Sequence, residues 1–556
     1  MSEPIIPQAE IPRASTAAKI GWAILIVATL YVCYFSHLGA IGFVGPDEPR
    51  YAWIARDMAE TGDWVTPRLY GKPWFEKPPL FYWGAALCFK LFGVGEAAAR
   101  LPSAISALLA TLALAWLALR LYGAETARWL LLLLPTTVGM IGFSHAAATD
   151  MPFTAMLTIA MVCAAVVLGL TRNENTPVLP QTPWLALILF GFFLGLAALA
   201  KGPAAIILSG GAIFFWALFT KRWRDAFRLL HPTAIASFCF TALPWYILCA
   251  RRNPNFFRIF IIEHNFKRYL TPEFQHIQPF WYYFPILLVA FLPWTGVLIW
   301  TMIAGSVRTW RAGQISSPAS FLLTWIGFCI VFFSVSQSKL PGYVLPAMPA
   351  IGLVLARCCG SLAAQSKNTI ALTLLATSLS LIGVAEAIGR MGGSLLKNLG
   401  AFQPAMAVLL LLLALPGLLL SAQFFCAKRR SMQTVLLVLS SLAMPFLIAN
   451  VDKLLPLSMM EVITPRGLAR DIKASRIPIG ELRITKLTRS MRYGLNFYLR
   501  ANLSDWDRDR SHEVYVLTEK LLVPCEKQPE GMACSDLWVE QERIDSYRLL
   551  HLVPKR

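Results

Sequence analysis

Apolar and polar positions along the chain form long apolar runs separated by short polar segments. Runs of about 17–25 residues are long enough to cross a bilayer as α-helices. The pattern therefore predicts an α-helical polytopic membrane protein with about thirteen transmembrane helices. The predicted helices cover residues 18–43, 97–119, 128–145, 151–171, 184–200, 203–220, 232–250, 281–304, 319–336, 343–360, 368–388, 404–425 and 432–449.

Two longer polar segments, residues 44–96 and 251–280, interrupt this pattern. The first contains a helix start at 47–49, where a carboxylate can cap the helix and proline can occupy its first turn. Gly62 is placed to end that helix. From Leu80 the sequence is aromatic and apolar with few charges, which is typical of a helix lying in the headgroup region. We therefore expect interfacial helices in these loops.

The pattern changes after Val451, where apolar runs give way to shorter amphipathic segments. Helical periodicity predicts one helix over 464–476, and alternation predicts strands on either side of a second helix. The predicted elements are strands over 479–488, 512–522 and 545–553, a helix over 490–502 and a surface loop over 504–509. The chain thus divides into a transmembrane domain, residues 1–450, and a small soluble α/β domain, residues 451–556.

The composition agrees with this pattern. Of the 556 residues, 56% are hydrophobic and 15% are charged, and the mean hydropathy is +0.57. These values exclude a water-soluble globule, and a transmembrane β-barrel would show short alternating segments instead. The net charge of +19 does not require a nucleic-acid partner. Lys and Arg accumulate in the cytoplasmic loops of membrane proteins and also attract anionic lipids.

The short loops give the orientation. Positive charge gathers in alternate loops, at Arg120 and Arg128, at Arg172, at 221–228, at Arg308 and Arg311, at Arg357 and Lys367, and at 428–430. Because such loops stay in the cytoplasm, we place them there together with the N-terminus. No small-residue cleavage site follows the first span, which we interpret as retained. An odd number of spans then puts the two long loops and residues 451–556 on the opposite face.

Cysteines are interpreted by their surroundings. Nine of the eleven lie in or beside apolar spans, where they are packing residues. Cys525 and Cys534 lie in the polar C-terminal part. They could close a small disulfide loop in an oxidising compartment, or remain two reduced thiols.

Ionisable and aromatic side chains gather at span ends on the face opposite the basic loops. The candidate catalytic residues are Asp47, Glu48 and Asp150, and the candidate substrate-binding residues are Arg50, Tyr51, Glu76, Lys77, Lys201, His264, Arg268, Lys339 and Tyr343. The span interiors carry almost no charge, whereas transporters place ionisable groups or broken helices near the midplane. This distribution favours chemistry at the membrane surface over a lipid flippase or transporter, which is the alternative of another class.

Each of these residues also has a structural interpretation. The Asp47-Glu48 pair or Asp150 could cap a helix, and Lys201 could extend its amine to the interface. His264 could form a structural hydrogen bond, and Lys339 could belong to a turn. The functional interpretation rests on the whole set lying on one face.

The chemistry of the set suggests a substrate. Arg and Lys at a wet, aromatic-lined interface suit a lipid phosphate. Carboxylates suit a sugar hydroxyl, a cationic amine or a transition state with oxocarbenium character. Together they predict glycosyl transfer from a polyprenyl-phosphate sugar, in which cations stabilise the departing phosphate.

The motifs also resemble a known family. They are similar to those of the bacterial C-type glycosyltransferases related to protein O-mannosyltransferases, and within them to the lipid A aminoarabinose transferases. The segments that carry the resemblance are 47–52 (Asp-Glu-Pro-Arg-Tyr-Ala), 55–58, 62–67, 75–79 (Phe-Glu-Lys-Pro-Pro), 263–268 (Glu-His-Asn-Phe-Lys-Arg) and 339–343. In 263–268 the spacing between His and Arg is one residue longer than in the family.

The resemblance implies a thirteen-span inner-membrane protein with a periplasmic C-terminal domain, a role in lipopolysaccharide modification and polymyxin resistance. It implies undecaprenyl phosphate-linked 4-amino-4-deoxy-L-arabinose as donor and a lipid A phosphate as acceptor. By the same resemblance Asp47 is the essential acid, Asp150 a second functional acid and Lys77 a contact of the lipid phosphate. A protein O-glycosyltransferase that uses a polyprenyl-phosphate sugar is the near alternative.

One physical argument bears on mechanism. A lipid A phosphate is ionised at neutral pH, because its last pKa is near ~6, and needs no general base. A Ser or Thr acceptor would need one, and Asp47 is then the first candidate. No second nucleophile is evident, so we expect direct displacement with inversion. No cofactor is required by the sequence. A divalent metal could bind Asp47, Glu48, Glu76, Asp150 or His264, none of which has a diagnostic spacing.

Overall fold

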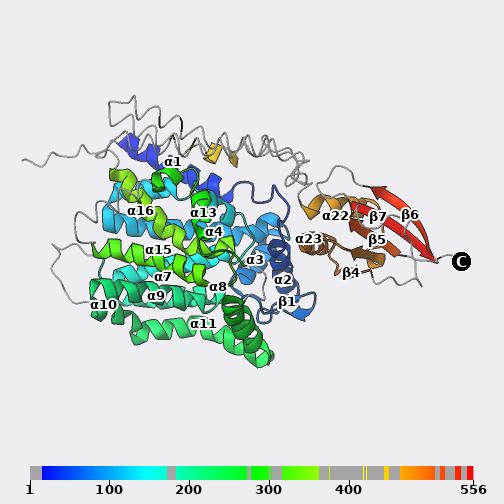
Figure 1. Ribbon diagram of the computed structural model, residues 1–556, viewed down its shortest axis with the longest axis horizontal. Coiled ribbons are helices and arrows are strands. Elements are labelled where there is room, and N and C mark those ends of the chain that lie inside the picture. Colours follow the sequence, from blue (N-terminus) through cyan, green and yellow to red (C-terminus); the bar gives the residue numbers. More distant parts are fainter. Residues whose placement is uncertain are drawn as a thin grey trace, which may run out of the picture.

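The computed structural model describes residues 16–171, 183–271, 277–299, 316–361, 464–506, 514–519, 532–539 and 547–554, with eleven isolated residues between 302 and 449. The chain is mainly helical, and Figure 1 shows its long helices side by side as a bundle, with the C-terminal strands beyond one end. Besides the elements bounded below, short helical segments are α10 (Trp223–Phe227), η1 (Arg228–Leu230), η2 (Arg258–Lys267), α12 (Arg268–Leu270) and η6 (Ile479–Glu481).

Six helices in the described part are long and apolar enough to cross a membrane, or seven if one bent pair counts as a span. The six are α4 (Glu96–Tyr122), α7 (Asp150–Val167), α8 (Trp184–Lys201), α11 (Pro232–Arg252), α15 (Ser317–Val335) and the continuous pair of η4 (Pro341–Ala347) and α16 (Met348–Ser361). Shorter apolar helices are α1 (Thr16–Phe35), α3 (Leu80–Phe92) and α9 (Ala204–Thr220).

Two predicted spans are broken. The run 128–145 forms α5 (Ala124–Leu133) and α6 (Val138–Ser144), bent by 63°. The run 281–304 contains α13 (Tyr283–Ala290), which ends before Pro293. Proline has no N–H to donate and cannot continue a helix without distortion. The predicted spans 368–388, 404–425 and 432–449 lie outside the described residues, apart from isolated positions.

The first loop folds as α2 (Asp47–Thr61), a two-stranded ribbon of β1 (Arg68–Leu69) and β2 (Lys72–Pro73), and then α3. Gly62 ends α2 as predicted, because its φ of 74° is in the left-handed region that glycine adopts without strain. The predicted carboxylate cap is wrong. Pro46 holds the cap position, and no side chain there accepts a hydrogen bond.

The C-terminal part contains a five-stranded sheet in the order β4-β3-β5-β7-β6. Its strands are β3 (Leu482–Thr485), β4 (Ser504–Asp505), β5 (Val514–Glu519), β6 (Met532–Val539) and β7 (Tyr547–Pro554), and its helices are α22 (Pro465–Ala474) and α23 (Arg489–Leu499). β3 is parallel to β4 and β5, whereas β7 is antiparallel to both its neighbours. The sequence did not predict β6 or β4. Pairing across the sheet sets these strands, because Cys534-Ser535-Asp536 has little strand preference of its own.

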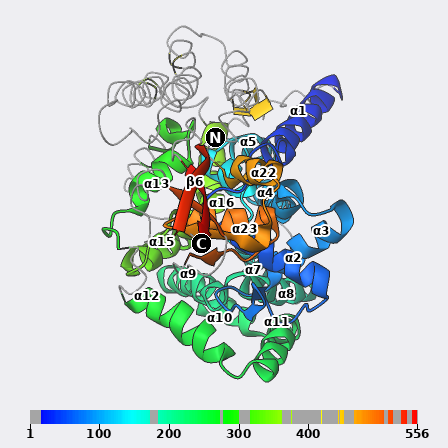
Figure 2. The same ribbon diagram turned by 90° about the vertical axis from the view of Figure 1, so that its right-hand side faces the viewer.

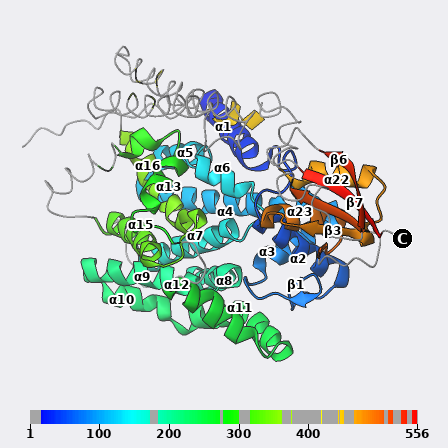
Figure 3. The ribbon, with the colours of Figure 1, turned by 45° about the vertical axis from the view of Figure 1, so that its right-hand side comes forward.

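Helix α23 packs against α2, as Figures 2 and 3 show. Aromatic rings and polar side chains both contribute to the contact of α23 with the first loop. Phe43 and Phe497 meet edge to face at 4.9 Å, and the Tyr498 hydroxyl donates to Glu96 at 2.8 Å. At the exposed rim Arg500 pairs with Glu60 at 2.8 Å. The first loop and the C-terminal part are therefore held face to face.

A buried ion pair fixes the base of the first loop. Arg100 on α4 forms two hydrogen bonds with the carboxylate of Glu48, at 2.9 and 2.8 Å. Its guanidinium also donates to the carbonyls of Leu38, Ile41 and Gly42. The planar guanidinium thus ties α2 to α4 and to the chain that leaves α1.

We expect Arg100→Lys to destabilise the fold. Lysine keeps the charge but cannot form the forked contacts of the guanidinium. Losing several hydrogen bonds to a charged buried group should lower the free energy of unfolding by about 2–3 kcal/mol. Thermal unfolding in detergent would measure this, with Arg120→Lys in the exposed last turn of the same helix as control. Equal melting temperatures for the two variants would contradict the assignment.

Candidate active site

Charged side chains from separate segments meet at the end of the bundle nearest α2. The participants are Asp47 and Arg50 on α2, Glu76 and Lys77 before α3, Asp150 at the start of α7, Lys201 at the end of α8 and Arg268 on α12. We call these seven residues the charged cluster. The structure thereby brings together residues that the sequence analysis grouped only by their predicted face.

Arg50 holds one half of the charged cluster together through two ion pairs. Its side chain is 4% exposed, and its Nη2 lies 2.5 Å from Asp47 Oδ1 and 3.1 Å from Glu76 Oε2. Asp47 by contrast is 50% exposed. Within the described part of the chain, Oδ2 of Asp47 has no hydrogen-bond partner. One carboxylate oxygen is therefore held and the other faces outward.

Glu76 links Arg50 to the second long loop. Its Oε1 lies 3.3 Å from Nη1 of Arg268, and its side chain is 10% exposed. Burial alone would raise the pKa of the Glu76 carboxyl, but Arg50, Lys77 and Arg268 together lower it to about 2. Glu76 is therefore ionised throughout the physiological range and acts as a fixed counter-charge between cations.

Lys77 differs from the other cations of the charged cluster. In the described residues it forms no ion pair within 4.0 Å. Burial and the nearby charges of Arg268 and Lys201 lower its pKa to about 8, although Glu76 and Asp150 oppose that shift. Lys77 thus lies between the two halves of the cluster, and an anion placed beside it would relieve its unfavourable environment.

Asp150 and Lys201 form the second half. Lys201 Nζ lies 2.5 Å from Asp150 Oδ1 and 4.7 Å from the ring centre of Tyr343. Lys201 ends α8 because Gly202, with φ at 77°, turns the chain into α9. Gly342 makes room for the carboxylate, since a Cβ there would lie 2.9 Å from Asp150 Oδ1. The Lys-Leu-Pro-Gly-Tyr turn therefore packs against Asp150.

Three other predicted residues are not members of the charged cluster. His264 is half-buried in η2, and burial lowers the pKa of its imidazole, which is neutral at pH 7. Tyr51 is buried among the rings of Phe81 and Tyr82. Lys339 donates from Nζ to the carbonyl of Ser336 at 2.6 Å, so its amine is held by its own turn.

Glu48 is separated from Asp47 despite being adjacent in sequence. It is 6% exposed, and both its oxygens accept hydrogen bonds, from Arg100 and from the backbone N–H groups of Val44 and Ala147. The expectation that Glu48 is a catalytic carboxylate does not fit this geometry, because no lone pair is left to face a substrate. Successive helical positions point about 100° apart, which separates the two carboxylates.

The sequence analysis missed two aromatic partners of the cluster. The guanidinium of Arg50 lies 5.4 Å from the ring of Trp74 and 5.7 Å from that of Tyr493 on α23. Both are within the range of a cation–π contact. No local signal marks Tyr493, because only the docking of the C-terminal part brings it here.

Among the described residues no group of three or more His, Cys, Asp or Glu side chains is arranged to hold a metal ion. Cys525 lies outside the described residues, so the predicted pair with Cys534 is not placed.

The arrangement has a clear chemical capacity. With all seven groups of the charged cluster ionised, four cations face three carboxylates, which leaves one surplus positive charge. Charge-assisted hydrogen bonds from Lys and Arg are the strong contacts for a phosphate. The cluster can therefore bind a phosphate and stabilise further negative charge on it.

Comparisons with known proteins agree with this chemistry. Residues 20–260 match the family model described as dolichyl-phosphate-mannose-protein mannosyltransferase. An undecaprenyl phosphate-alpha-4-amino-4-deoxy-L-arabinose arabinosyl transferase of Sodalis glossinidius is 31% identical over 95% of this chain and 98% of its own length. One of Edwardsiella ictaluri is 33% identical over 60% of this chain and 59% of its own.

A solved structure is similar over nearly the whole chain. The crystal structure of ArnT from Cupriavidus metallidurans bound to undecaprenyl phosphate superposes with a TM-score of 0.78 at 24% identity. The match covers 96% of this chain and 98% of that one. It establishes a common fold.

We expect Glu76→Gln to destabilise the first loop. Without its negative charge, the buried guanidinium of Arg50 would lose its main counter-charge, and breaking a buried pair in this way costs about 3–5 kcal/mol. The control is Glu60→Gln, because Glu60 is 52% exposed and a surface pair contributes only about 0–1 kcal/mol. Thermal unfolding of both variants in one detergent would measure the difference. Equal shifts would refute the role of Glu76 as counter-charge.

Proposed function

The chain belongs to the family of undecaprenyl phosphate-alpha-4-amino-4-deoxy-L-arabinose arabinosyl transferases, and from this premise we propose how its charged cluster works. It is a multi-pass membrane glycosyltransferase that takes aminoarabinose from undecaprenyl phosphate. The acceptor in this proposal is a phosphate of lipid A, exposed at the membrane surface where the cluster lies.

One observation supports the proposal most directly. Lys77 has no ion-pair partner in the described part of the chain, although it lies within reach of four other charged side chains. A partly buried cation without a close counter-charge is unfavourable unless a ligand supplies one. The phosphate of the undecaprenyl donor supplies that charge, and Arg268 lies near enough to share it.

The reaction follows from this placement. An ionised oxygen of the acceptor phosphate attacks C1 of the sugar. The bond between C1 and the oxygen of undecaprenyl phosphate breaks, and its electron pair stays on that oxygen. Lys77 and Arg268 stabilise the charge that develops there. The acceptor carries no proton that must be removed at neutral pH, and a single displacement inverts the configuration at C1.

Asp47 has a different part in this proposal. Its outward oxygen, with the other held by Arg50, suits an electrostatic contact with the ammonium of the donor sugar. Asp150 holds Lys201 beside Tyr343 and so shapes the opposite wall. Glu48 positions the first loop through Arg100 without touching a substrate.

The membrane arrangement belongs to the same proposal. It comprises thirteen spans within residues 1–450, a cytoplasmic N-terminus and a periplasmic α/β domain over residues 451–556. The positive charge of the loop after α9 and the soluble composition of the C-terminal part support this orientation. A disulfide between Cys525 and Cys534 would then lie in an oxidising compartment.

A protein acceptor is the second candidate, and the match of residues 20–260 to the protein mannosyltransferase family favours it. A serine or threonine hydroxyl must lose a proton during transfer. Asp47 would then serve as base through its outward oxygen. The two candidates differ in which molecule gains mass.

The test is turnover by the full-length protein in membranes, with defined undecaprenyl phosphate sugars, purified lipid A and a peptide mixture. We expect lipid A to gain one pentosamine, measured by mass spectrometry. Asp47→Asn should lower the rate by about 10²–10³-fold while undecaprenyl phosphate still binds. The matched control is Asp57→Asn on the same helix. Transfer to peptides only, or full activity of Asp47→Asn, would overturn the proposal.

The depressed pKa of Lys77 predicts a pH dependence of donor-lipid binding. The Lys77 amine carries its charge below about pH 8 and loses it as pH rises through that value. Affinity for undecaprenyl phosphate should therefore fall between pH 7 and 9. Lys77→Arg should abolish the fall, because arginine stays charged. Lys72→Arg in the exposed ribbon serves as control. An unchanged pH profile in Lys77→Arg would show that another group titrates.

A further inference from the structure

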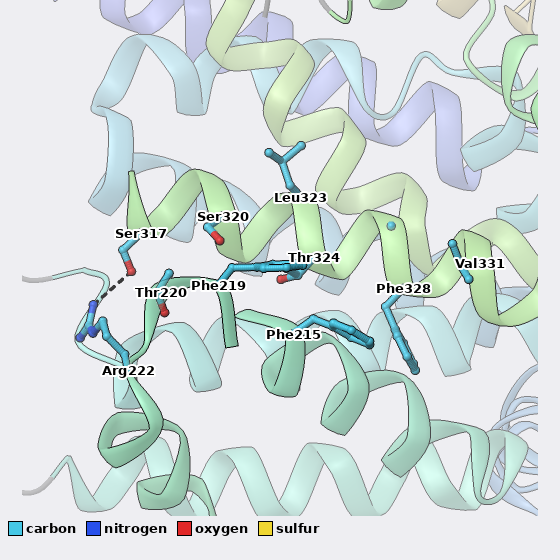
Figure 4. Close-up of a pocket in the computed structure, with 11 residues that line it drawn as sticks. Phe215, Phe219, Thr220, Arg222, Ser317, Ser320, Leu323, Thr324, Phe328 and Val331 are labelled. Atoms are coloured by element: carbon cyan, nitrogen blue, oxygen red, sulfur yellow. Dashed lines mark hydrogen bonds between the residues drawn. The ribbon is translucent and has the colours of Figure 1, made fainter. Parts of the chain in front are cut away.

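A second site lies far from the charged cluster. Helices α9 and α15 line an open cavity of ≈ 800 Å³, which Figure 4 shows. This volume is within the range of ligand pockets, about 300–1,000 Å³. α9 begins beside Lys201 and its 17 residues span about 25 Å. The polar end of the cavity is therefore at the opposite face of the membrane from the charged cluster.

The cavity changes character along its length. At one end lie Arg222 and the hydroxyls of Thr220 and Ser317, with Nη1 of Arg222 donating to Ser317 Oγ at 3.1 Å. At the other end Phe328 and Val331 line it (Figure 4). A cavity that is polar at the membrane surface and apolar toward the membrane interior matches a molecule with a polar head and an acyl chain.

Two glycines shape the contact between the helices. Phe328 lies against Gly211, where a Cβ would come within 2.1 Å of the ring, so α15 can approach α9 only at a glycine. Gly327, which lines the cavity, has no atom within 4 Å of the position a Cβ would occupy. A larger side chain at Gly327 would therefore enter the cavity without a clash in the protein.

Basic residues follow the polar end of the cavity along the chain. Residues 221–228 contain Lys221, Arg222, Arg224 and Arg228 with Asp225 as the one acid. Asp225 already pairs with Arg222 at 2.7 Å and Arg228 at 3.1 Å. Lys221 and Arg224 are exposed, and in the described part of the chain neither has an ion-pair partner. Positive charge therefore lies close to the polar end of the cavity, because Lys221 stands between the lining residues Thr220 and Arg222.

We propose that this cavity is a binding site for an anionic glycerophospholipid. An acyl chain occupies the apolar part between α9 and α15, and the phosphate lies at the polar end near Lys221 and Arg224. Basic pockets between transmembrane helices bind anionic headgroups in this way. The site is independent of the donor and acceptor, and only its assignment to the cytoplasmic leaflet rests on the orientation proposed above.

The experiment uses the full chain reconstituted in vesicles with equal amounts of phosphatidylglycerol and phosphatidylcholine. After extraction, native mass spectrometry counts the lipids that each protein retains. We expect wild type to retain one phosphatidylglycerol and Gly327→Leu to lose it. The matched control is Gly210→Leu on α9, because Gly210 also has an open Cβ position but does not line the cavity. It should retain the lipid.

A second variant tests the charge. Lys221→Gln with Arg224→Gln leaves the apolar cavity open and should lower the preference for phosphatidylglycerol over phosphatidylcholine by roughly tenfold. Four results would overturn the proposal: Gly327→Leu retains phosphatidylglycerol, Gly210→Leu loses it as well, wild type retains both lipids equally, or endogenous undecaprenyl phosphate displaces phosphatidylglycerol from the site.

Discussion

A charge at the edge of a bilayer is stable only beside an opposite charge or in water, and this constraint shapes the whole active end of the molecule. Arg50, Arg268 and Lys201 each have a carboxylate within 4.0 Å. Lys77 does not. In the three paired cations, the nearby carboxylate offsets the free-energy cost of desolvation. Binding of an anion therefore stabilises Lys77 more than it would stabilise the other three cations.

The same constraint explains the division of labour between adjacent carboxylates. Glu48 neutralises Arg100 in the interior and fixes the first loop on α4. Asp47 stays half-exposed with one oxygen directed outward. A carboxylate whose two oxygens both accept hydrogen bonds inside the protein fixes the position of the loop. A carboxylate with one oxygen directed outward can contact a substrate. The first loop therefore needs both, although only one of them faces the reaction.

Most of the membrane helices could be predicted from the sequence, because such helices are recognisable by their length and apolar composition. Gly62 and the set of charged residues at one face were likewise recognisable from local patterns. The role of Glu48 was not, since sequence shows which carboxylates are adjacent but not which one meets Arg100. Tyr493 and β6 depend on contacts between distant segments, and no local propensity encodes them.

The docking of α23 on α2 has a consequence for how this enzyme can diversify. Tyr493 lies over the guanidinium that organises Asp47 and Glu76, so the C-terminal part lies against the charged cluster. The surface of α23 must stay complementary to the first loop, whereas β6 lies at the edge of the sheet. Sequence variation should therefore accumulate at the β6 edge and be rare on the α23 surface that packs against α2.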